Sequence, residues 1–361
     1  MTIRPIEHSV KAYESWLRKQ LGGETVGADL EEKHTRMADS PFAFLRATYW
    51  RWAERILSVC DKLEGAPTVL AIGDIHLENF GTWRDEEGRL VWGINDFDEA
   101  AEMPYALDLV RLATSAILAR SAQGTSVSEI CKKVVEGYEA GIAEPQPFVL
   151  DQDHRWLRNL VGVSEAERAD FWNKMTPKRS SSAGAKRYVE ALAAAMPAAD
   201  SKMIIWRRRA GLGSLGRPRW VALSTWRGGP VVREAKAIVP SSWTYVHGPR
   251  TATTHCEKLA SGGYRSPDPW YRVIKNIVVR RLSPNNRKVE LKHEPEQLLA
   301  PRMLRAMGNE VANIHLGATG DAAAILRDLK KRKSRWLRDA AIAAADMVRE
   351  DHRAWKVGQE R

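Results

Sequence analysis

The chain has few of the residues that mark secreted or metal-stabilised proteins. Its 361 residues include three cysteines, Cys60, Cys131 and Cys256, which lie far apart. An odd number of cysteines without the paired spacing of zinc ligands argues against both a disulfide framework and a zinc site. The segment Met1–Trp16 has no apolar signal core, and no stretch of the sequence reaches the length of a membrane span. These absences predict a cytoplasmic protein with no membrane partner.

Acidic residues are too few to balance the basic ones, which leaves a net charge of +11. A basic surface attracts phosphates of any kind, including those of nucleotides and nucleic acid. The densest basic run, Arg327–Arg338, has the apolar residues Ile325, Leu329 and Trp336 near helical spacing. That spacing favours an amphipathic helix with its charges in solvent, because no nucleic-acid motif accompanies the run. A nucleic-acid-binding module is the alternative.

The spacing of apolar residues predicts an α+β protein with a β-rich block late in the chain. The expected helices are Ser9–Leu63 with a start at Pro41, Tyr105–Ala143 with a break near Gly124, and Glu296 to the end. The expected strands are a hairpin-like unit of Pro67–Ile72 with Arg89–Ile94, then runs within Met203–Val239 and Tyr271–Leu282, and a short strand after the turn SPNN. The best linker candidate is Lys178–Lys186, which consists mainly of small and polar residues.

A glycine motif, GLGSLG, lies inside the β-rich block. Gly211, Gly213 and Gly216 let the backbone turn tightly and bring its N–H groups against phosphate oxygens, and Ser214 lies between them. A dinucleotide-binding fingerprint needs a helix directly after the loop, whereas Arg219–Trp226 has the pattern of a strand. In protein-kinase-like enzymes, a glycine loop between two strands covers the nucleotide.

Lys236 lies on the next expected strand, between Ala235 and Ala237. A lysine among small apolar residues on a strand can hold the α- and β-phosphates of a nucleotide as a point charge. The alternative interpretation of the loop and the lysine together is an ordinary β-meander with a surface lysine.

Two polar segments, GDIHLENFG and INDFDEA, follow the first two expected strands. Phosphoryl transfer to a hydroxyl needs a carboxylate near the attacking oxygen and oxygen ligands for Mg²⁺. Asp74 and Asn79 in the first segment supply a candidate base and a carbonyl ligand, and Asp96 in the second supplies a carboxylate ligand. The alternative is that these three residues cap turns. His76 has no partner ligand nearby, which favours a hydrogen-bonding role in the loop.

These segments resemble the aminoglycoside-phosphotransferase and choline-kinase group. GDIHLEN is similar to that group's catalytic loop, roughly HGDxHxxN, INDFDEA is similar to its metal-binding strand end, and PYALDLVRLA is similar to the helix start that follows. The resemblance implies an ATP-dependent, Mg²⁺-dependent enzyme with Asp74 as catalytic base. It further implies Asn79 and Asp96 as magnesium ligands and Lys236 as the phosphate-holding lysine. Asp98 is a candidate ligand for a second metal.

Some features depart from the expected kinase patterns. Ile72 stands where the group usually has a histidine. Asp98 stands where protein kinases have glycine, although the small-molecule kinases commonly have an acid there. The glycine loop and Lys236 also follow the catalytic loop instead of preceding it. Circular permutation accounts for this order, because chain ends often lie close together and permutation at exposed sites is tolerated. Met303–Ala318 resembles the helix that directly precedes the catalytic loop in aminoglycoside-type kinases, and here it lies near the C-terminus.

The whole ensemble resembles a bacterial family of unknown function with a permuted kinase-like core. This implies a two-lobed, protein-kinase-like fold of the aminoglycoside-phosphotransferase type. The implied parts are an N-terminal helical segment of the large lobe (1–70), its catalytic and metal-binding part (71–200), a small β-rich nucleotide-binding lobe (201–292) and C-terminal helices completing the large lobe (293–361). Glu257 is a candidate partner of Lys236 at the nucleotide, and Arg36 and Arg46 are candidate contacts for an anionic substrate or surface pairs.

The function expected from the resemblance is transfer of the ATP γ-phosphate to a hydroxyl of a small molecule or protein. Alternatives on the same scaffold are transfer of AMP and nucleotide binding without catalysis. The non-enzymatic alternative is nucleic-acid binding, which leaves the acidic segments unexplained because carboxylates without metal repel phosphates.

Overall fold

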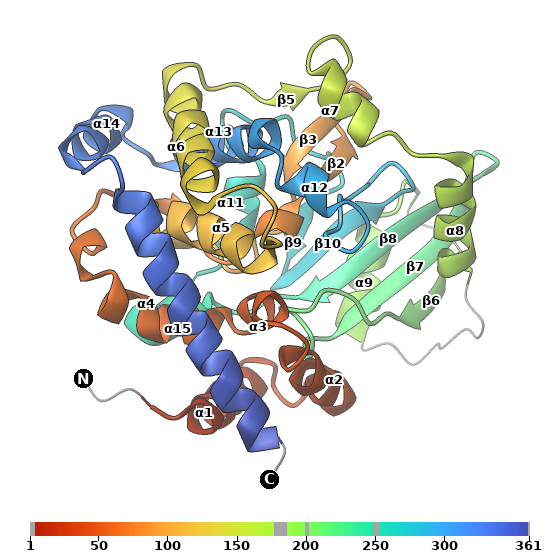
Figure 1. Ribbon diagram of the computed structural model, residues 1–361. Helices are drawn as coiled ribbons and strands as arrows, with labels where there is room; N and C mark the ends of the chain where they lie inside the picture. The colour runs from red at the N-terminus through yellow and green to blue at the C-terminus, as the bar shows by residue number, and fades with distance from the viewer. Residues whose placement is uncertain (1–3, 177–185, 199–201, 249–252, 360–361) are drawn as a thin grey trace.

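A computed structural model describes residues 4–176, 186–198, 202–248 and 253–359. Figure 1 shows a mainly helical part beside a five-stranded sheet, with the long helix α15 (Trp336–Gln359) running across the helical part. The architecture is α+β, as expected. Most of the expected linker, and the boundary expected between residues 200 and 201, lie outside the described residues. Within the described part of the chain, no helix is both long enough and apolar enough to cross a membrane.

The N-terminal part is helical, as predicted. Its helices are α1 (Ile6–Gln20), α2 (Gly27–Met37), α3 (Pro41–Ala47) and α4 (Tyr49–Val59), followed by a 3-10 turn at Asp61–Leu63. Helix α3 starts at Pro41 because the Ser40 hydroxyl accepts a hydrogen bond from Ala43 N at 3.1 Å and proline fits the first helical position.

The expected hairpin is wrong in its pairing. Strand β1 (Thr68–Ala71) pairs antiparallel with β4 (Ala101–Pro104), whereas β3 (Leu90–Ile94) pairs with β2 (Phe80–Arg84) and with the two-residue strand β5 (Phe148–Val149). Strand β2 was missed because its glycine and arginine break the apolar pattern that identifies a strand. Both pairs therefore end at the polar segments, so GDIHLENFG lies between β1 and β2, and INDFDEA between β3 and β4.

Helices surround these short strands. They are α5 (Tyr105–Ala119), α6 (Val127–Ala143) and α13 (Pro301–Ala318), with α14 (Ala322–Lys331) and α15 completing the helical part. Helix α13 packs along α6, and α15 packs along α5. Most side chains of α5 and α13 are buried. Helices α13 and α15, from the C-terminal part of the chain, belong to the same hydrophobic core as the segment that follows β1.

The β-rich part is one antiparallel sheet with strand order β6-β7-β8-β10-β9. Its strands are β6 (Ile204–Arg207), β7 (Arg219–Trp226), β8 (Gly229–Ala237), β9 (Arg272–Ile274) and β10 (Ile277–Leu282). Lys275 and Asn276 turn in the left-handed region between β9 and β10. The short strand expected after SPNN is wrong, because only the single bridge between Gly81 and Lys288 forms there.

Shorter helices link the two parts. They are α7 (Arg155–Leu160), α8 (Glu165–Met175), α9 (Lys186–Ala194), α10 (Ser242–His247), α11 (Cys256–Ala260) and α12 (Pro295–Leu298). In Figure 1, α8 and α9 lie beside the five-stranded sheet. Helix α9 contacts β7, β8 and β10, and Met175 at the end of α8 is buried against β7 and β8.

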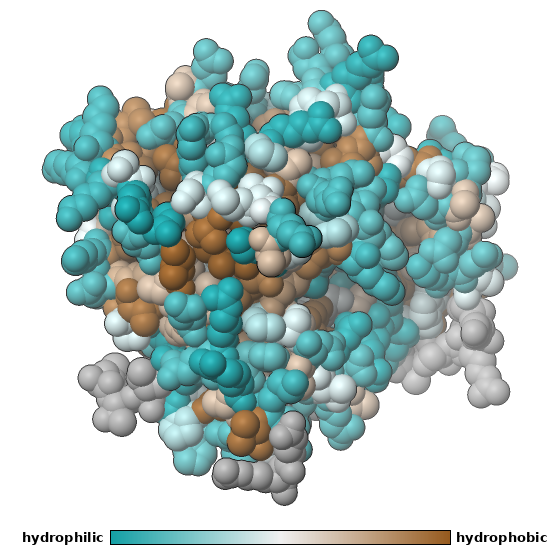
Figure 2. Space-filling model, viewed as in Figure 1, coloured by the Kyte–Doolittle hydropathy of each residue, from teal (hydrophilic) through white to brown (hydrophobic). Residues whose placement is uncertain are grey.

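The basic run does not form the single helix expected. Helix α14 ends at Lys331 and α15 begins at Trp336, and the chain turns between them. The apolar residues Ile325 and Leu329 are buried, as their spacing predicts. The charged residues lie outward, and Arg332 is paired with Asp328 at 2.6 Å. Figure 2 shows a largely hydrophilic surface over α14.

Candidate functional site

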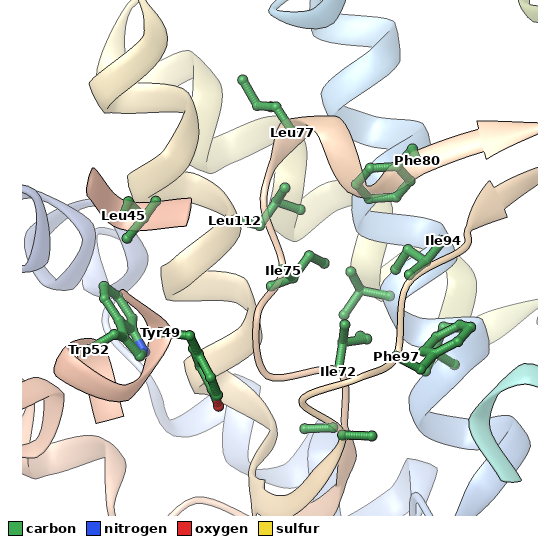
Figure 3. Close-up of a cluster of buried hydrophobic side chains, with 14 of the residues drawn as sticks. Leu45, Tyr49, Trp52, Ile72, Ile75, Leu77, Phe80, Ile94, Phe97 and Leu112 are labelled. Atoms are coloured by element: carbon green, nitrogen blue, oxygen red, sulfur yellow. The ribbon is translucent and has the colours of Figure 1, made fainter. Parts of the chain in front are cut away.

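The segment after β1 is held by its apolar residues, which alternate with its polar ones. Ile72, Ile75 and Leu77 are fully buried. Figure 3 shows these side chains among the apolar residues of α3, α4 and α5. Burying alternate side chains of a short loop leaves the intervening Asp74 and His76 facing the other way. The hydrophobic core thus fixes which atoms of this loop line the site.

Asp108 on α5 ties this loop to the C-terminal helices. Its carboxylate accepts hydrogen bonds from Ile72 N at 2.7 Å and Gly73 N at 3.0 Å. It also lies 2.9 Å from His315 Nε2 on α13, and the other ring nitrogen of His315 lies 2.8 Å from the Tyr138 hydroxyl. All of these groups are buried. A histidine from a distant helix is therefore linked to the loop through Asp108, although residue 72 is isoleucine.

Gly73 adopts a left-handed backbone conformation, with φ of +80°. A Cβ atom there would overlap the Glu99 carbonyl oxygen and lie 2.8 Å from the Tyr49 hydroxyl oxygen. The loop between β1 and Asp74 therefore requires glycine for both conformation and space.

We expect Gly73→Ala to lower the free energy of unfolding by about 3 kcal/mol, because backbone strain and overpacking add at this position. The matched control is Gly88→Ala, since Gly88 has a φ of +77° but open space around it. The control should lose only about 1 kcal/mol. Guanidinium unfolding of both variants measures the difference, and equal losses would show that close packing at Gly73 is unimportant.

Asp74 forms an ion pair with Arg111, which sequence reasoning missed. The Arg111 guanidinium on α5 is fully buried, donates to the Asp74 carboxylate and to Leu45 O, and lies over the Tyr49 ring. Burial raises the pKa of Asp74 to about 7, against the opposing charge of Arg111. A carboxylate with a pKa near neutrality has the proton affinity that a general base needs.

His76 and Asn79 cap the 3-10 helix Leu77–Asn79. Asn79 Oδ1 accepts a hydrogen bond from His76 N at 2.8 Å, and His76 Nδ1 accepts one from Glu78 N at 3.1 Å. Burial lowers the pKa of His76 well below its ordinary value, so the ring is neutral. Both residues therefore shape the loop, and Asn79 also lines the cavity that contains Asp74 and Asp96.

Lys236 on β8 meets the acids that follow β3. Lys236 Nζ lies 2.6 Å from Asp98 Oδ2 and 3.4 Å from Asp96 Oδ1, so residues far apart in sequence share one ion-pair cluster. Burial opposes ionisation of Asp96, but Lys236, Lys288 and Arg280 outweigh it and hold the pKa of Asp96 well below its usual range. Burial raises the pKa of Asp98, against the charge of Lys236. Asp96 is the more open of the two, with 35% of its side chain exposed.

Arg217, directly after the glycine motif, forms a second buried link to this cluster. Its guanidinium lies 3.3 Å from Asp98 Oδ2 and 2.7 Å from Glu99 Oε1. Glu99 also accepts a hydrogen bond from Ser242 N at 2.5 Å. The end of the glycine loop is thus fixed to the segment that carries Asp96 and Asp98.

The glycine motif lies directly over Asp74. A Cβ atom at Gly213 would be 3.1 Å from Asp74 Oδ2, and Gly213 O accepts a hydrogen bond from Lys33 Nζ at 2.9 Å. Gly216 O accepts one from Val26 N at 3.0 Å, and Leu30 fills the space where a Gly216 side chain would be. Helix α2 therefore holds the loop against Asp74.

The other predicted loop residues have structural partners. Gly211 turns with a φ of +76°. The Ser214 hydroxyl accepts a hydrogen bond from Arg219 at 2.7 Å. Arg219 also reaches Glu234, which is fully buried and surrounded by Arg208, Arg219 and Arg280. Burial opposes ionisation of Glu234, but these arginines hold its pKa well below the usual range.

The expected pairing of Glu257 with Lys236 is wrong. Glu257 is exposed on the short helix α11, and its carboxylate accepts a hydrogen bond from Val273 N at 3.3 Å. Lys236 is instead neutralised by the acids after β3. Of the two arginine candidates, Arg36 pairs with Glu32 on the surface of α2, whereas Arg46 pairs with Glu78 at 2.6 Å and lines the cavity at Asp74.

Two cavities lie near this cluster, and Lys288 lines both. The smaller, about 70 Å³, is lined by Asp74, Asn79, Asp96, Asp98 and the glycine motif. The larger, about 370 Å³, lies between the five-stranded sheet and the β2–β3 pair, and Trp83, Phe97 and Tyr271 line its wall. Its volume is in the range of small-molecule sites.

The residues of this site lie within two overlapping matches to one family model. The model is described as "Uncharacterized protein conserved in bacteria (DUF2252)", and it matches residues 26–203 and 185–357. The chain belongs to the DUF2252 family. Comparison with curated proteins and with solved structures gave no significant match. The DUF2252 match includes all the predicted site residues, together with Arg111 and Arg217, which the sequence motifs did not identify.

Proposed function

We propose that this protein is a Mg²⁺- and ATP-dependent phosphotransferase with a circularly permuted, protein-kinase-like core. One observation carries the proposal: Lys236 from the five-stranded sheet lies within 3.4 Å of Asp96 and 2.6 Å of Asp98 from the helical part. Phosphoryl transfer requires a cation that binds the phosphates close to carboxylates that bind the metal. In this fold the cation comes from the sheet and the carboxylates come from the helical part.

The arrangement of elements supports the kinase-like interpretation. The glycine motif connects the adjacent antiparallel strands β6 and β7, and Lys236 lies on the next strand, β8. The end of α15 packs on α1, since a Cβ atom at Gly358 would lie 2.6 Å from Glu7 Oε1. Neighbouring first and last helices are what a circular permutation of a two-lobed fold requires.

Each residue has a distinct role in the proposed reaction. Asp74 accepts the proton of the acceptor hydroxyl, and Arg111 keeps its carboxylate oriented. Lys236 and the backbone of the glycine motif hold the nucleotide phosphates. The larger cavity holds the base and ribose. Because Gly213 lies against Asp74, the loop must lift to admit the acceptor.

The metal donors suit Mg²⁺ held jointly with a nucleotide. Among the described residues, no group of three or more His, Cys, Asp or Glu side chains is arranged to hold a metal ion. Asp96 has exposed oxygen, Asp98 shares its carboxylate with Lys236, and Asn79 Oδ1 has a second lone pair. Mg²⁺ uses one or two carboxylates together with substrate phosphates, and when bound it neutralises charge on the transferred group.

Incubation with Mg²⁺ and ATP tests the proposal. We expect slow ATP hydrolysis without an acceptor, with ADP and phosphate as products, and a mass gain of one phosphate on an acceptor supplied from a cell extract. A gain of AMP would instead establish nucleotidyl transfer on the same residues. Absence of both ATP binding and turnover would overturn the proposal. The three cysteines are free and buried, which supports a reducing, cytoplasmic setting.

A further inference from the structure

Lys288 is held beside the catalytic segment by contacts with β2. Its backbone bridges Gly81, and the neighbouring Arg287 O accepts a hydrogen bond from Thr82 N at 2.9 Å. The Lys288 side chain packs over Gly81, which has no side chain of its own. A Cβ atom added to Gly81 would lie 3.2 Å from Lys288 Cγ. The strand that leaves the Asp74 loop therefore fixes the position of this lysine.

The Lys288 ammonium differs from the neighbouring cations in having no direct partner among the described residues. In the part of the chain that the structure describes, no carboxylate forms an ion pair with it. Lys236 is neutralised by Asp98 at 2.6 Å, and Arg280 is paired with Glu234 at 2.8 Å. Burial, aided by the charges of Arg280, Arg46 and Lys236 and opposed by Asp96, lowers the pKa of Lys288 to about 8. An ammonium destabilised in this way gains most from an arriving anion.

Lys288 also joins the two cavities. Among the described residues that line them, it is the one that both share. It faces Asp96 across the smaller cavity, and each group shifts the pKa of the other without contact. The space between a free ammonium and a metal-ligating carboxylate suits a phosphate that contacts the ammonium on one side and a metal on the other.

We propose that Lys288 is a second phosphate-binding residue, which holds the nucleotide's phosphate chain where it passes from the larger cavity to the acids. This inference rests on the proposed function. It adds a cation that neither the glycine motif nor the Lys236 strand supplies. It also sets the orientation of the bound nucleotide, with the base in the larger cavity and the terminal phosphate near Asp74.

Binding measurements on Lys288→Ala test the inference. We expect calorimetric titration with Mg·ATP and Mg·ADP to give a dissociation constant about tenfold higher than for the wild type, from loss of one charged contact. Binding of adenosine, which has no phosphate, should stay within about twofold. Lys288→Arg should restore most of the affinity. Lys292→Ala, an exposed lysine four residues further on, is the matched control and should bind like the wild type.

The outcomes separate the inference from the proposed function. If the wild type binds Mg·ATP and the folded Lys288→Ala variant binds it equally well, the role of Lys288 is wrong and the proposed function stands. If the variant loses adenosine as much as ATP, Lys288 shapes the cavity and does not bind phosphate. If the wild type binds neither ATP nor adenosine, both proposals fail.

Discussion

Asp74→Asn is expected to lower the turnover number of the proposed phosphotransferase reaction by about 10²–10⁴-fold, which is the usual contribution of a positioned general base. Asparagine keeps the shape of the side chain and can still accept a hydrogen bond from Arg111. The affinity for ATP should change little, because the proposed mechanism places the Asp74 carboxylate on the acceptor hydroxyl and not on the nucleotide. Turnover and ATP binding measured on the same preparation separate the two effects.

The same residue sets the expected pH dependence. Burial raises the pKa of Asp74 to about 7, so the carboxylate is protonated and inactive at pH 5. We expect kcat/KM to rise about tenfold per pH unit up to this pKa and to level off above pH 8. The raised pKa also means that neutral Asp74 stabilises the fold below pH 4 and that this contribution is lost as the pH rises through 7. In Asp74→Asn, the rise of kcat/KM toward pH 7 and the contribution of Asp74 to the pH dependence of stability should both disappear, and an unchanged activity profile would exclude Asp74 as the base.

Asp96→Ala is expected to reduce Mg²⁺-dependent turnover by at least about 10³-fold, because no other exposed carboxylate faces Lys236 among the described residues. The fold should survive, since Lys236 keeps its shorter ion pair with Asp98 and Asp96 is partly open to solvent. The free energy of unfolding should fall by no more than about 1 kcal/mol.

Asp153→Ala is the control for this variant, because Asp153 is also an aspartate in a loop but is exposed and outside both cavities. It should retain wild-type turnover. Normal turnover in Asp96→Ala, with normal dependence on Mg²⁺, would remove Asp96 from the metal site and with it the main support for phosphoryl transfer.

Local patterns predicted most of the secondary structure but not the strand pairing. Ser40 and Pro41 begin α3 as expected, because a cap and a first-turn proline act within a few residues. The pairing of β1 with β4 depends on how the chain turns through Asp96–Ala100, and no local sequence pattern predicts this turn. The basic run showed a helical spacing on both sides of Arg332, and the spacing alone could not reveal that the chain turns there.

The candidate site was predictable where its residues sit in short motifs. Asp74, Asn79 and Asp96 line one cavity, and Lys236 meets Asp96, as the resemblance implied. Arg217 and Lys288 were not predictable, because their surroundings in the fold are distant in sequence and arginine and lysine are common in this basic chain. Arg111 lies within PYALDLVRLA, but the motif did not indicate that its side chain pairs with Asp74. Glu257 shows the opposite error: an acid at a suitable spacing that tertiary structure turns outward.

The contact between His315 and Asp108 has a consequence for how the protein is made. During synthesis the segment that carries Asp74 leaves the ribosome more than 200 residues before His315 does, since 207 positions separate Asp108 from His315. Until α13 arrives, Asp108 lacks its imidazole partner and the loop lacks the helix that buries it. The nascent chain therefore cannot complete the packing around the candidate site before α13 has been made. A chain that ends before α13 would carry Asp74, Asp96 and Lys236 but would lack the buried imidazole that pairs with Asp108.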